Sequence, residues 1–311
     1  MSHDFTVTFL GVRGSIPVPG PSTLKIGGNS SCVQIEILNH TFFLDAGTGI
    51  ISAGKKLVNT FLTSSSDSHK QLFTSILISH THHDHIMGLP FFAPLFLQQS
   101  HISIFGPSIY GPINYPHTDL QYVLNMLMDQ MFFPIDLQET PSIKQIISLK
   151  PQNQIVFSPQ TSIPELVQQN NFNPTSDQIV ISQYRNYAHP KNGVLVYKIS
   201  FNGKTIVYAT DLESYISGDQ RLIQFSMNAD LLIHDSQYTE EQYMKIPSVQ
   251  GFGHSTAEMA CYVAKKANVK QLLLYHHDPN HSDDEIFKKE IKAKELFPHA
   301  QAAYEGLILK I

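Results

Sequence analysis

The amino-acid sequence predicts an α/β protein, with α+β character, in which two β-sheets pack together and helices cover their outer faces. Short apolar segments rich in β-branched residues, typical of strands, recur in both halves of the chain. Segments with apolar residues at helical spacing also occur in both halves, and each such face must be buried against another layer. No linker or change in composition divides the sequence, so we expect residues 1–311 to form a single domain.

The composition narrows the class of protein. Hydrophobic residues make up 42% and charged residues 15% of the chain, which is ordinary for a folded protein. The net charge is −5 and no run of Lys or Arg exceeds two residues, so no general basic surface for nucleic acid is expected. Cys32 and Cys261 are far apart and favour free thiols. We find no signal peptide and no apolar stretch of roughly 20 residues, and we expect a cytoplasmic protein without a membrane partner.

The first part of the chain predicts strands and one helix. The strands are expected at residues 5–10, 32–38, 41–44 and 73–78, and the helix at residues 50–59. The third strand ends on Asp45 and a glycine turn, and residues 64–68 form a polar loop.

Residues 89–185 have a mixed pattern. They predict a strand at 102–105, an amphipathic helix at 119–130 whose apolar stripe extends to Met131 and packs in the core, and a turn-rich segment at 158–177. The rest of the chain predicts strands at 179–184, 194–201, 205–209, 231–234, 271–275 and 302–311, and helices at 256–267 and 284–295.

A histidine-rich run directly follows the strand at 73–78. It holds His80, His82, His83, Asp84 and His85 within six positions. A rigid strand that leads into such a loop fixes imidazoles in place, and imidazole with carboxylate suits zinc and its first-row neighbours. The alternative is a surface histidine patch, which is disfavoured because other strand ends supply further ligands.

Three more strands end on polar residues of the same kind. His189 lies between two strands, Asp211 follows the strand at 205–209, and His276 and His277 follow the strand at 271–275. Loops at strand ends gather at one edge of a sheet, so these side chains are expected to join the histidine-rich run.

This set of residues resembles the metallo-β-lactamase superfamily, whose fold is a four-layered αβ/βα sandwich. The resemblance covers nearly the whole chain, from the Gly11–Ser15 stretch to the last strand, and the H-x-H-x-D-H signature is highly specific. The resemblance implies a first metal bound by His80, His82 and His189, a second bound by Asp84, His85 and His276, and Asp211 as the bridge between them.

His276 is preferred to His277 because it directly follows the strand, and His83 is expected to be exposed or to stand behind the ligands. The implied cofactors are two divalent metal ions, Zn²⁺ in the first place, with Mn²⁺ or Fe²⁺ as alternatives. Two such ions share a water molecule and lower its pKa towards neutrality. Asp84 should stay ionised beside them and orient the resulting hydroxide.

Two further motifs point to one branch of the superfamily. The stretch from Gly253 to Glu258 resembles the H-S-T motif of the RNase Z-like phosphodiesterases, and the strand ending at Asp235 resembles the strand before it in that branch. Ser255-x-x-Glu258 predicts a capping box, which would place His254 just before a helix N-terminus that favours phosphate. His254 is therefore expected to act as the general acid, oriented by Asp235 or His234.

The substrate is expected to be a small phosphodiester. RNase Z enzymes carry a tRNA-clamping arm between the ligands that correspond to His189 and Asp211, and here these residues are only 22 positions apart. With the acidic net charge, the missing arm argues against tRNA as a partner. Two cysteines cannot supply the structural zinc site of the phosphonate-pathway relatives. The Gly11–Ser15 and 276–279 stretches resemble a bacterial group linked to cyclic nucleotides, so a 3′,5′-cyclic nucleotide is expected.

Several alternatives stay open. The enzyme could hydrolyse a thioester or a lactone, or process RNA, and a metal-bound protein that binds without catalysis is a further alternative. Arg13 could contact a phosphate or form a structural salt bridge. The segment 100–184 is expected to cover the site and contribute aromatic contacts such as Tyr110, Tyr115 or Phe132. A homodimer is expected only by analogy with related enzymes.

Overall fold

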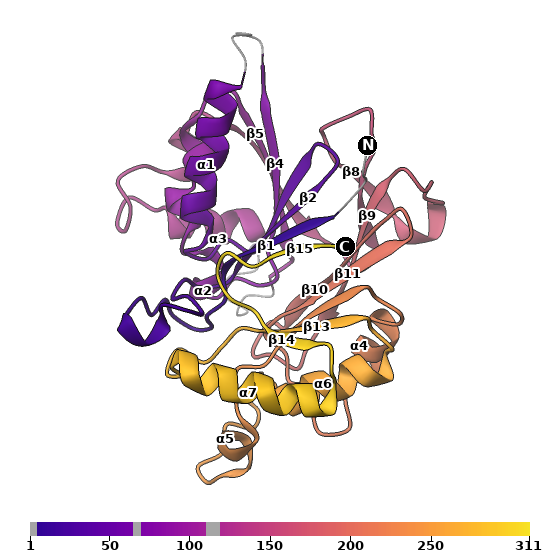
Figure 1. Cartoon of the computed structure of the whole chain (residues 1–311). Helices are drawn as coiled ribbons and strands as arrows, with labels where there is room; N and C mark the ends of the chain where they lie inside the picture. Colours follow the sequence, from indigo (N-terminus) through magenta and orange to yellow (C-terminus); the bar gives the residue numbers. More distant parts are fainter. Residues whose placement is uncertain (1–4, 65–69, 110–118) are drawn as a thin grey trace.

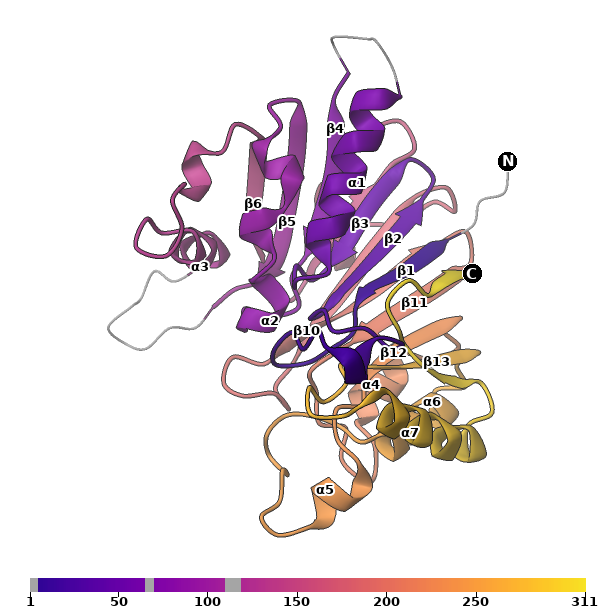
Figure 2. The same cartoon turned by 60° about the vertical axis from the view of Figure 1, so that its left-hand side comes forward.

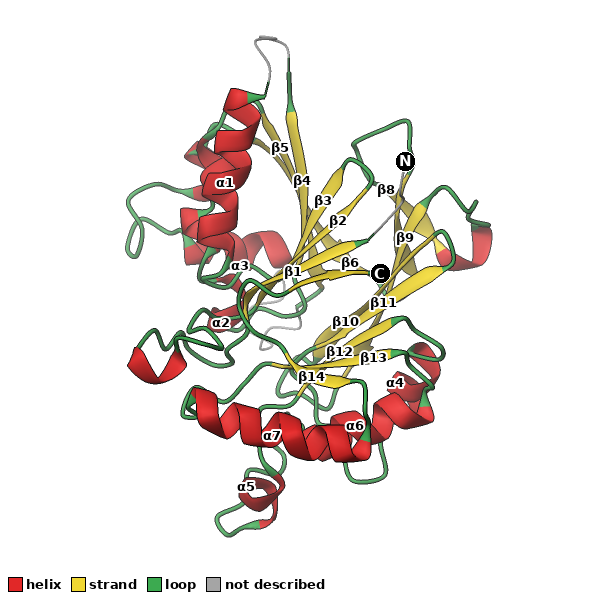
Figure 3. Cartoon of the chain, viewed as in Figure 1, coloured by secondary structure: helices red, strands yellow, loops and turns green. Residues whose placement is uncertain are grey.

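Two β-sheets lie face to face between two outer layers of helices in the computed structural model, which describes residues 5–64, 70–109 and 119–311 (Figures 1 and 3). This arrangement confirms the predicted fold class of a four-layered sandwich. The chain builds the first sheet and its helices, then the second sheet, and returns to the edge of the first sheet with its last strand.

The first sheet has the strand order β15-β1-β2-β3-β4-β5-β6. Its strands β3, β4, β5 and β6 run parallel to one another, so their carboxyl ends lie at one edge. Its strands are β1 (Thr6–Gly11), β2 (Cys32–Ile37), β3 (His40–Leu44), β4 (Leu72–Leu77), β5 (Ser100–Pro107), β6 (Ile143–Leu149) and β15 (Ile308–Lys310).

The second sheet has the strand order β14-β13-β12-β11-β10-β9-β7-β8. Strands β11, β12, β13 and β14 are parallel, so their carboxyl ends also share an edge. Its strands are β7 (Asn153–Phe157), β8 (Glu165–Gln168), β9 (Ile179–Asn186), β10 (Val194–Phe201), β11 (Lys204–Ala209), β12 (Leu231–Asp235), β13 (Gln271–Tyr275) and β14 (Ala300–Ala302).

Helices cover the outer face of each sheet (Figures 1 and 2). Helices α1 and α3 lie on the first sheet, whereas α4, α6 and α7 lie on the second. The α-helices are α1 (Ile50–Thr63), α2 (His83–Ile86), α3 (Leu120–Leu127), α4 (Gln220–Phe225), α5 (Glu240–Met244), α6 (Ala257–Lys266) and α7 (Asp283–Leu296). Short 3₁₀ helices occur at η1 (Pro21–Thr23), η2 (Leu89–Phe91), η3 (Ala93–Phe96), η4 (Leu137–Glu139) and η5 (Gln169–Asn171).

Three clusters of buried apolar side chains fill the three spaces between the layers. One lies between the sheets and includes Phe42, Phe157 and Tyr197, another lies under α4, α6 and α7, and the third lies under α1 and α3. A hydrogen bond from the Tyr197 hydroxyl to the Ile78 carbonyl (2.7 Å) and one from Leu195 N to Ser79 O (2.8 Å) join the sheets close to the histidine-rich loop. The carboxyl ends of β3 and β4 therefore meet those of the second sheet.

Most predicted elements are present with small shifts in their ends, but some differences are larger. Strands β6, β7 and β8 and the short helices α2, α4 and α5 were not predicted. Strand β6 lies at the edge of its sheet with Ile143 57% exposed, so it lacks the continuous apolar pattern of a buried strand.

The strand predicted at 302–311 is in fact two strands in opposite sheets. A turn at Glu305 and Gly306, where Gly306 has φ +84°, carries the chain from β14 to β15. The helix predicted at 119–130 ends early, and Met131 is 75% exposed instead of packing in the core.

Within the described residues, no helix is both long enough and apolar enough to cross a bilayer. Both cysteines are buried free thiols, as the sequence predicted.

Candidate metal centre and acid–base pair

The loop after β4 and the turn after β9 bring three histidines together. Nε2 of His189 lies 3.0 Å from Nδ1 of His82, and the ring of His80 lies 4.4 Å from that of His82 and 4.8 Å from that of His189. One nitrogen of each ring lies within 4.8 Å of the others, which is a spacing that one metal ion can span. Nδ1 of His189 donates to the carbonyl of Gly253 (3.0 Å), so its Nε2 is left as the metal-binding lone pair.

A second group lies beside the first and consists of Asp84, His85, Asp211 and His276. Oδ2 of Asp84 lies 3.1 Å from Nε2 of both His85 and His276, and the two imidazole nitrogens are 3.3 Å apart. All four side chains are buried. These atoms converge on one point from three strand-end loops, one in the first sheet and two in the second.

Asp211 stands between the two groups with one oxygen turned towards each. Its Oδ1 lies 3.1 Å from Nε2 of His85 and of His276, whereas its Oδ2 lies 3.6 Å from His80 and 3.9 Å from His189. The backbone of Asp211 has φ +50°, so the chain turns sharply at the end of β11 and directs the carboxylate inward. This is the geometry that a bridging carboxylate requires.

The chemistry of the two groups fits divalent cations. Nε2 of His80 is buried and has no hydrogen-bond partner among the described residues, although such atoms are normally paired. Burial lowers the pKa of His80 well below its usual value and that of His189 to about 4, so both rings are neutral, as metal ligands must be. Nitrogen and carboxylate donors at this density match zinc and similar metals.

The second group has an excess of negative charge around His85. Burial opposes the charged form of this ring, yet the carboxylates of Asp211, Asp84 and Asp45 raise its pKa well above the usual value. Burial alone would raise the pKa of Asp211, but His276, His85 and His80 hold it well below its usual range. A divalent cation would balance these carboxylates.

Asp45 is buried, and the sequence predicted only that it ends the third strand. It accepts hydrogen bonds from His85 Nδ1 (2.7 Å), Ser79 N (2.6 Å), Ser79 Oγ and the hydroxyl of Tyr208. Its bond to Nδ1 leaves Nε2 of His85 free to face the second group. The sequence feature that could have predicted this role is an aspartate at the carboxyl end of β3, the strand next to β4.

The loop after β1 lies against the second group. Ser15 N donates to Oδ2 of Asp84 (2.7 Å), and a Cβ on Gly14 would come within 2.4 Å of the His276 ring. Gly14 N donates to the carbonyl of His277. Arg13 is fully buried, donates to the carbonyls of three residues (Gly27, Asp278 and His281), and lies 3.8 Å from Asp283. Of the two roles considered for Arg13, a phosphate contact and a structural salt bridge, these contacts favour the structural one.

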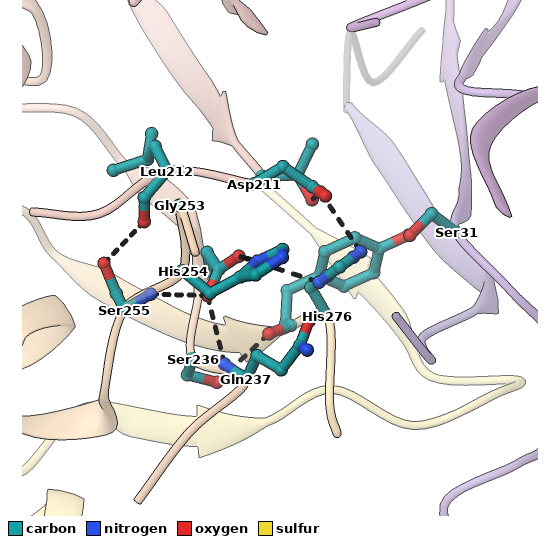
Figure 4. Close-up of polar contacts among 12 residues, drawn as sticks. Ser31, Asp211, Leu212, Ser236, Gln237, Gly253, His254, Ser255 and His276 are labelled. Atoms are coloured by element: carbon teal, nitrogen blue, oxygen red, sulfur yellow. Dashed lines mark hydrogen bonds and ion pairs between the residues drawn. The ribbon is translucent and has the colours of Figure 1, made fainter. Parts of the chain in front are cut away.

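His254 and Asp235 form a pair that borders both groups, and Figure 4 shows His254 beside His276. Nδ1 of His254 lies 2.7 Å from Oδ2 of Asp235, and because a carboxylate only accepts, Nδ1 donates and Nε2 faces away from it. The His254 ring stacks on His276 (5.1 Å, 13°) and meets His189 edge-on (5.1 Å). Burial lowers the pKa of His254, but the Asp235 carboxylate outweighs this effect and raises it to about 9.

Asp235 itself is completely buried and held in place. Its Oδ1 accepts from the backbone N–H groups of Gln237 and Ser255, both at 3.0 Å. His234, the alternative partner for His254, turns away and bonds Ser214 Oγ (2.9 Å). Of the two residues predicted to orient His254, Asp235 and His234, only Asp235 forms a hydrogen bond with it among the described residues.

The predicted capping box at Ser255 is not formed. Helix α6 begins after Thr256, whose side chain accepts from Met259 N, so Thr256 is the N-cap. Ser255 instead donates from Oγ to the carbonyl of Leu212 (2.7 Å; Figure 4), and it accepts from Ser214 N. His254 consequently lies two residues before the N-cap, and its position depends on the loop after β11 rather than on the helix.

All nine residues predicted for the site come together in the structure: His80, His82, Asp84, His85, His189, Asp211, Asp235, His254 and His276. His83 is exposed and His277 bonds the carbonyl of Ala303, so neither joins the two groups. Tyr110 and Tyr115 lie outside the described residues, and Phe132 is 74% exposed.

Comparison with known proteins gives the family. The Beta-lactamase superfamily domain matches residues 40–277, which is more than half of the chain. Ribonuclease Z of Picrophilus torridus is 26% identical over 99% of this chain and 96% of its own length, and that of Thermoplasma acidophilum is 27% identical over 94% and 92%.

Two solved structures share the fold over almost their whole length. The metallo-β-lactamase fold protein YhfI from Bacillus subtilis superposes with a TM-score of 0.65 at 20% identity, with both chains covered completely. The short form of human tRNase Z superposes with a TM-score of 0.60 at 20% identity, with 98% of each chain covered.

These comparisons overturn one prediction. The curated relatives that match the whole chain are named ribonuclease Z, so the prediction that tRNA is excluded as a partner is wrong. It relied on the short segment from His189 to Asp211, only 22 positions that β10 and β11 fill, and on the net charge. Neither property decides whether RNA binds, because phosphate contacts can be spread over loops elsewhere on a protein.

The matched domain, the full-length relatives and the clustered ligands agree with one another. The chain therefore belongs to the metallo-β-lactamase superfamily, and it is a metal-dependent hydrolase of the branch that contains ribonuclease Z.

Proposed function

We propose that this protein hydrolyses phosphodiesters, with two divalent metal ions at the paired ligand groups and His254 as the general acid. Zn²⁺ is the proposed metal because nitrogen ligands predominate in the first group. The observation that carries the proposal is the His254–Asp235 pair. The ring of His254 contacts His189 of the first group and His276 of the second. A proton donor placed there suits a reaction with a leaving oxygen.

Asp84, His254 and Asp235 have separate roles in the proposed reaction. When bound, two divalent ions supply charge stabilisation and an acidified water molecule. Asp84, fixed by the N–H of Ser15, is placed to orient the attacking water. Nε2 of His254 protonates the leaving oxygen while Asp235 holds the ring and balances its charge.

Two substrate classes are proposed, each on its own observation. RNA is favoured by relatives named ribonuclease Z that match the whole chain. A 3′,5′-cyclic nucleotide is favoured by the two stretches that resemble a cyclic-nucleotide group, since they lie together at the metal centre. In the structure, Gly14 N bonds His277 O and Ser15 N bonds Asp84.

The test uses the full chain loaded with zinc or manganese. We expect hydrolysis of bis(p-nitrophenyl) phosphate that EDTA abolishes and Asp84→Ala lowers at least 100-fold, by the usual size of acid–base and ligand effects. Turnover of a precursor tRNA transcript, of cyclic AMP and of cyclic GMP then ranks the two substrate classes. Absence of any EDTA-sensitive diester cleavage, or faster turnover of a thioester such as S-lactoylglutathione, would contradict the proposal.

A further inference from the structure

Glu213 is a buried carboxylate close to the metal centre to which neither the sequence nor the proposed mechanism gives a role. It is 2% exposed and lies two residues after Asp211, in the connection from β11 to α4. Burial of an ionised carboxylate is costly unless hydrogen bonds compensate it, so its partners indicate what the residue stabilises.

Within the described residues, the hydrogen-bond partners of Glu213 all lie on one neighbouring segment, the chain from α5 to His254. Oε2 of Glu213 accepts from Gly251 N (2.9 Å) and Gly253 N (3.3 Å), and Oε1 accepts from the hydroxyl of Tyr243. Glu213 therefore ties the helix α5 and two backbone amides of the following loop to the loop that carries Asp211. We call residues 251–253 the glycine loop.

The glycine loop reaches both the metal ligands and the general acid. The carbonyl of Gly253 accepts from Nδ1 of His189, and His254 is the next residue. Gly253 has φ +88°, and a Cβ there would lie 2.5 Å from Nδ1 of His189, so the backbone passes directly against the ligand. A displacement of the glycine loop would thus move His254 and release His189 from its hydrogen bond.

The other side of His254 is held by hydrogen bonds that do not involve the Glu213 side chain. Ser255 bonds Leu212 O and Ser214 N, and its own N–H bonds Asp235. Loss of Glu213 would therefore free the chain before His254 while the chain after it stays fixed. This predicts a loosened acid group within a folded protein.

We infer that Glu213 is a positioning residue, which holds the glycine loop so that His254 stays aligned with the leaving oxygen. This inference rests on the proposed function, because it assigns Glu213 a part in proton transfer by His254. The hydroxyl of Tyr243, on α5, donates to Glu213 and helps to hold its carboxylate against the glycine loop.

The experiment uses two diesters that differ only in the leaving group, methyl p-nitrophenyl phosphate and methyl phenyl phosphate. The phenolate leaves poorly and depends on a proton donor, whereas p-nitrophenolate leaves with little help. If Glu213 aligns the acid, Glu213→Gln should lower kcat at least tenfold more for the phenyl ester than for the p-nitrophenyl ester. His254→Ala should show the same dependence more strongly, and Tyr243→Phe more weakly.

Asp230→Asn is the matched control. Asp230 is a buried carboxylate of the same sheet that accepts from a backbone amide, Thr205 N (2.8 Å), but it lies before β12, away from the site. It should show no leaving-group dependence. Bound metal per chain is measured for every variant by atomic emission.

The outcomes separate the two proposals. If His254→Ala shows no leaving-group dependence, the general acid of the proposed function is wrong. If His254→Ala shows it but Glu213→Gln slows both esters equally, or regains full activity with added zinc, the positioning role of Glu213 is overturned. If Glu213→Gln reproduces the pattern of His254→Ala with its metal content intact, the inference holds.

Discussion

At the scale of single residues, the site depends on side chains that orient other side chains. Asp45 fixes His85, Asp235 fixes His254, and the carbonyl of Gly253 fixes His189, each through Nδ1. In every case the nitrogen that faces the reaction is Nε2. An imidazole whose Nδ1 is hydrogen-bonded has only Nε2 left to bind a metal or carry a proton. These contacts therefore determine which role each histidine can take.

Asp45→Asn should weaken the second metal site without unfolding the protein. The amide keeps the size of the carboxylate but presents a donor or a weaker acceptor to Nδ1 of His85. We expect 10- to 100-fold weaker zinc affinity, in the range found for such outer contacts. Competition titration with a chromophoric chelator measures it, and an affinity equal to that of the wild type would contradict this role.

His254→Ala and Asp235→Asn should lower kcat for diesters with poor leaving groups by about 10²- to 10⁴-fold, the range for a general acid. Neither residue belongs to the two ligand groups that we propose for the metals, so bound zinc should be unchanged. Steady-state kinetics with metal analysis tests the prediction. A large fall in bound zinc in Asp235→Asn would instead indicate a ligand role.

At the scale of elements, the site consists of the loops that follow strands rather than of the strands themselves. Asp45, Asp211 and His276 each come directly or almost directly after a strand, and all three have positive φ. The backbone bends at these points so that the side chain turns back over the sheet edge. The glycine loop achieves the same result by a close backbone approach to His189.

Gly253→Ala should therefore disturb the site, while Gly203→Ala should not. Both residues have positive φ, +88° and +73°, so an alanine costs about 1 kcal/mol of backbone strain at either position. Only at Gly253 does the new Cβ meet a ligand, at 2.5 Å, since nothing lies within 4 Å at Gly203. We expect lower zinc content and activity in Gly253→Ala alone; equal behaviour of the two variants would refute the steric argument.

At the scale of the whole molecule, the sequence predicted the layers and the ligands better than the connections between elements. His80, His82, Asp84 and His85 follow a strongly apolar strand, which makes both the strand and the loop visible. Strand β6 and helix α5 are exposed or short, so their residues obey surface rather than core constraints. The role proposed for Glu213 could not be predicted, because two of its three hydrogen-bond partners are backbone amides, which carry no side-chain pattern.

The stability of the molecule should depend on pH through Lys289. This lysine of α7 is 5% exposed and donates to the carbonyls of Ser236 and Gln237, and burial lowers its pKa to about 8. The unfolded chain, with a pKa near 10.5, binds the proton more tightly than the folded chain. Between pH 8 and 10.5 the free energy of unfolding should therefore gain about 3 kcal/mol from this group as the pH rises.

Urea unfolding at pH 7 and pH 10 measures this effect, with Lys289→Met as the reference that removes the titrating group. The difference in unfolding free energy between the wild type and Lys289→Met should shift in favour of the wild type at the higher pH. The same difference at both pH values would mean that Lys289 does not titrate in this window.

The placement of Asp211 between ligands from both sheets has a consequence for the newly made chain. His80, His82, Asp84 and His85 leave the ribosome early, but they have no complete site until β11 and β13 have followed and packed against the first sheet. A chain that ends before β13 lacks His276 and cannot complete the second ligand group. The complete ligand set therefore forms only after synthesis has passed β13 and the two sheets have packed together.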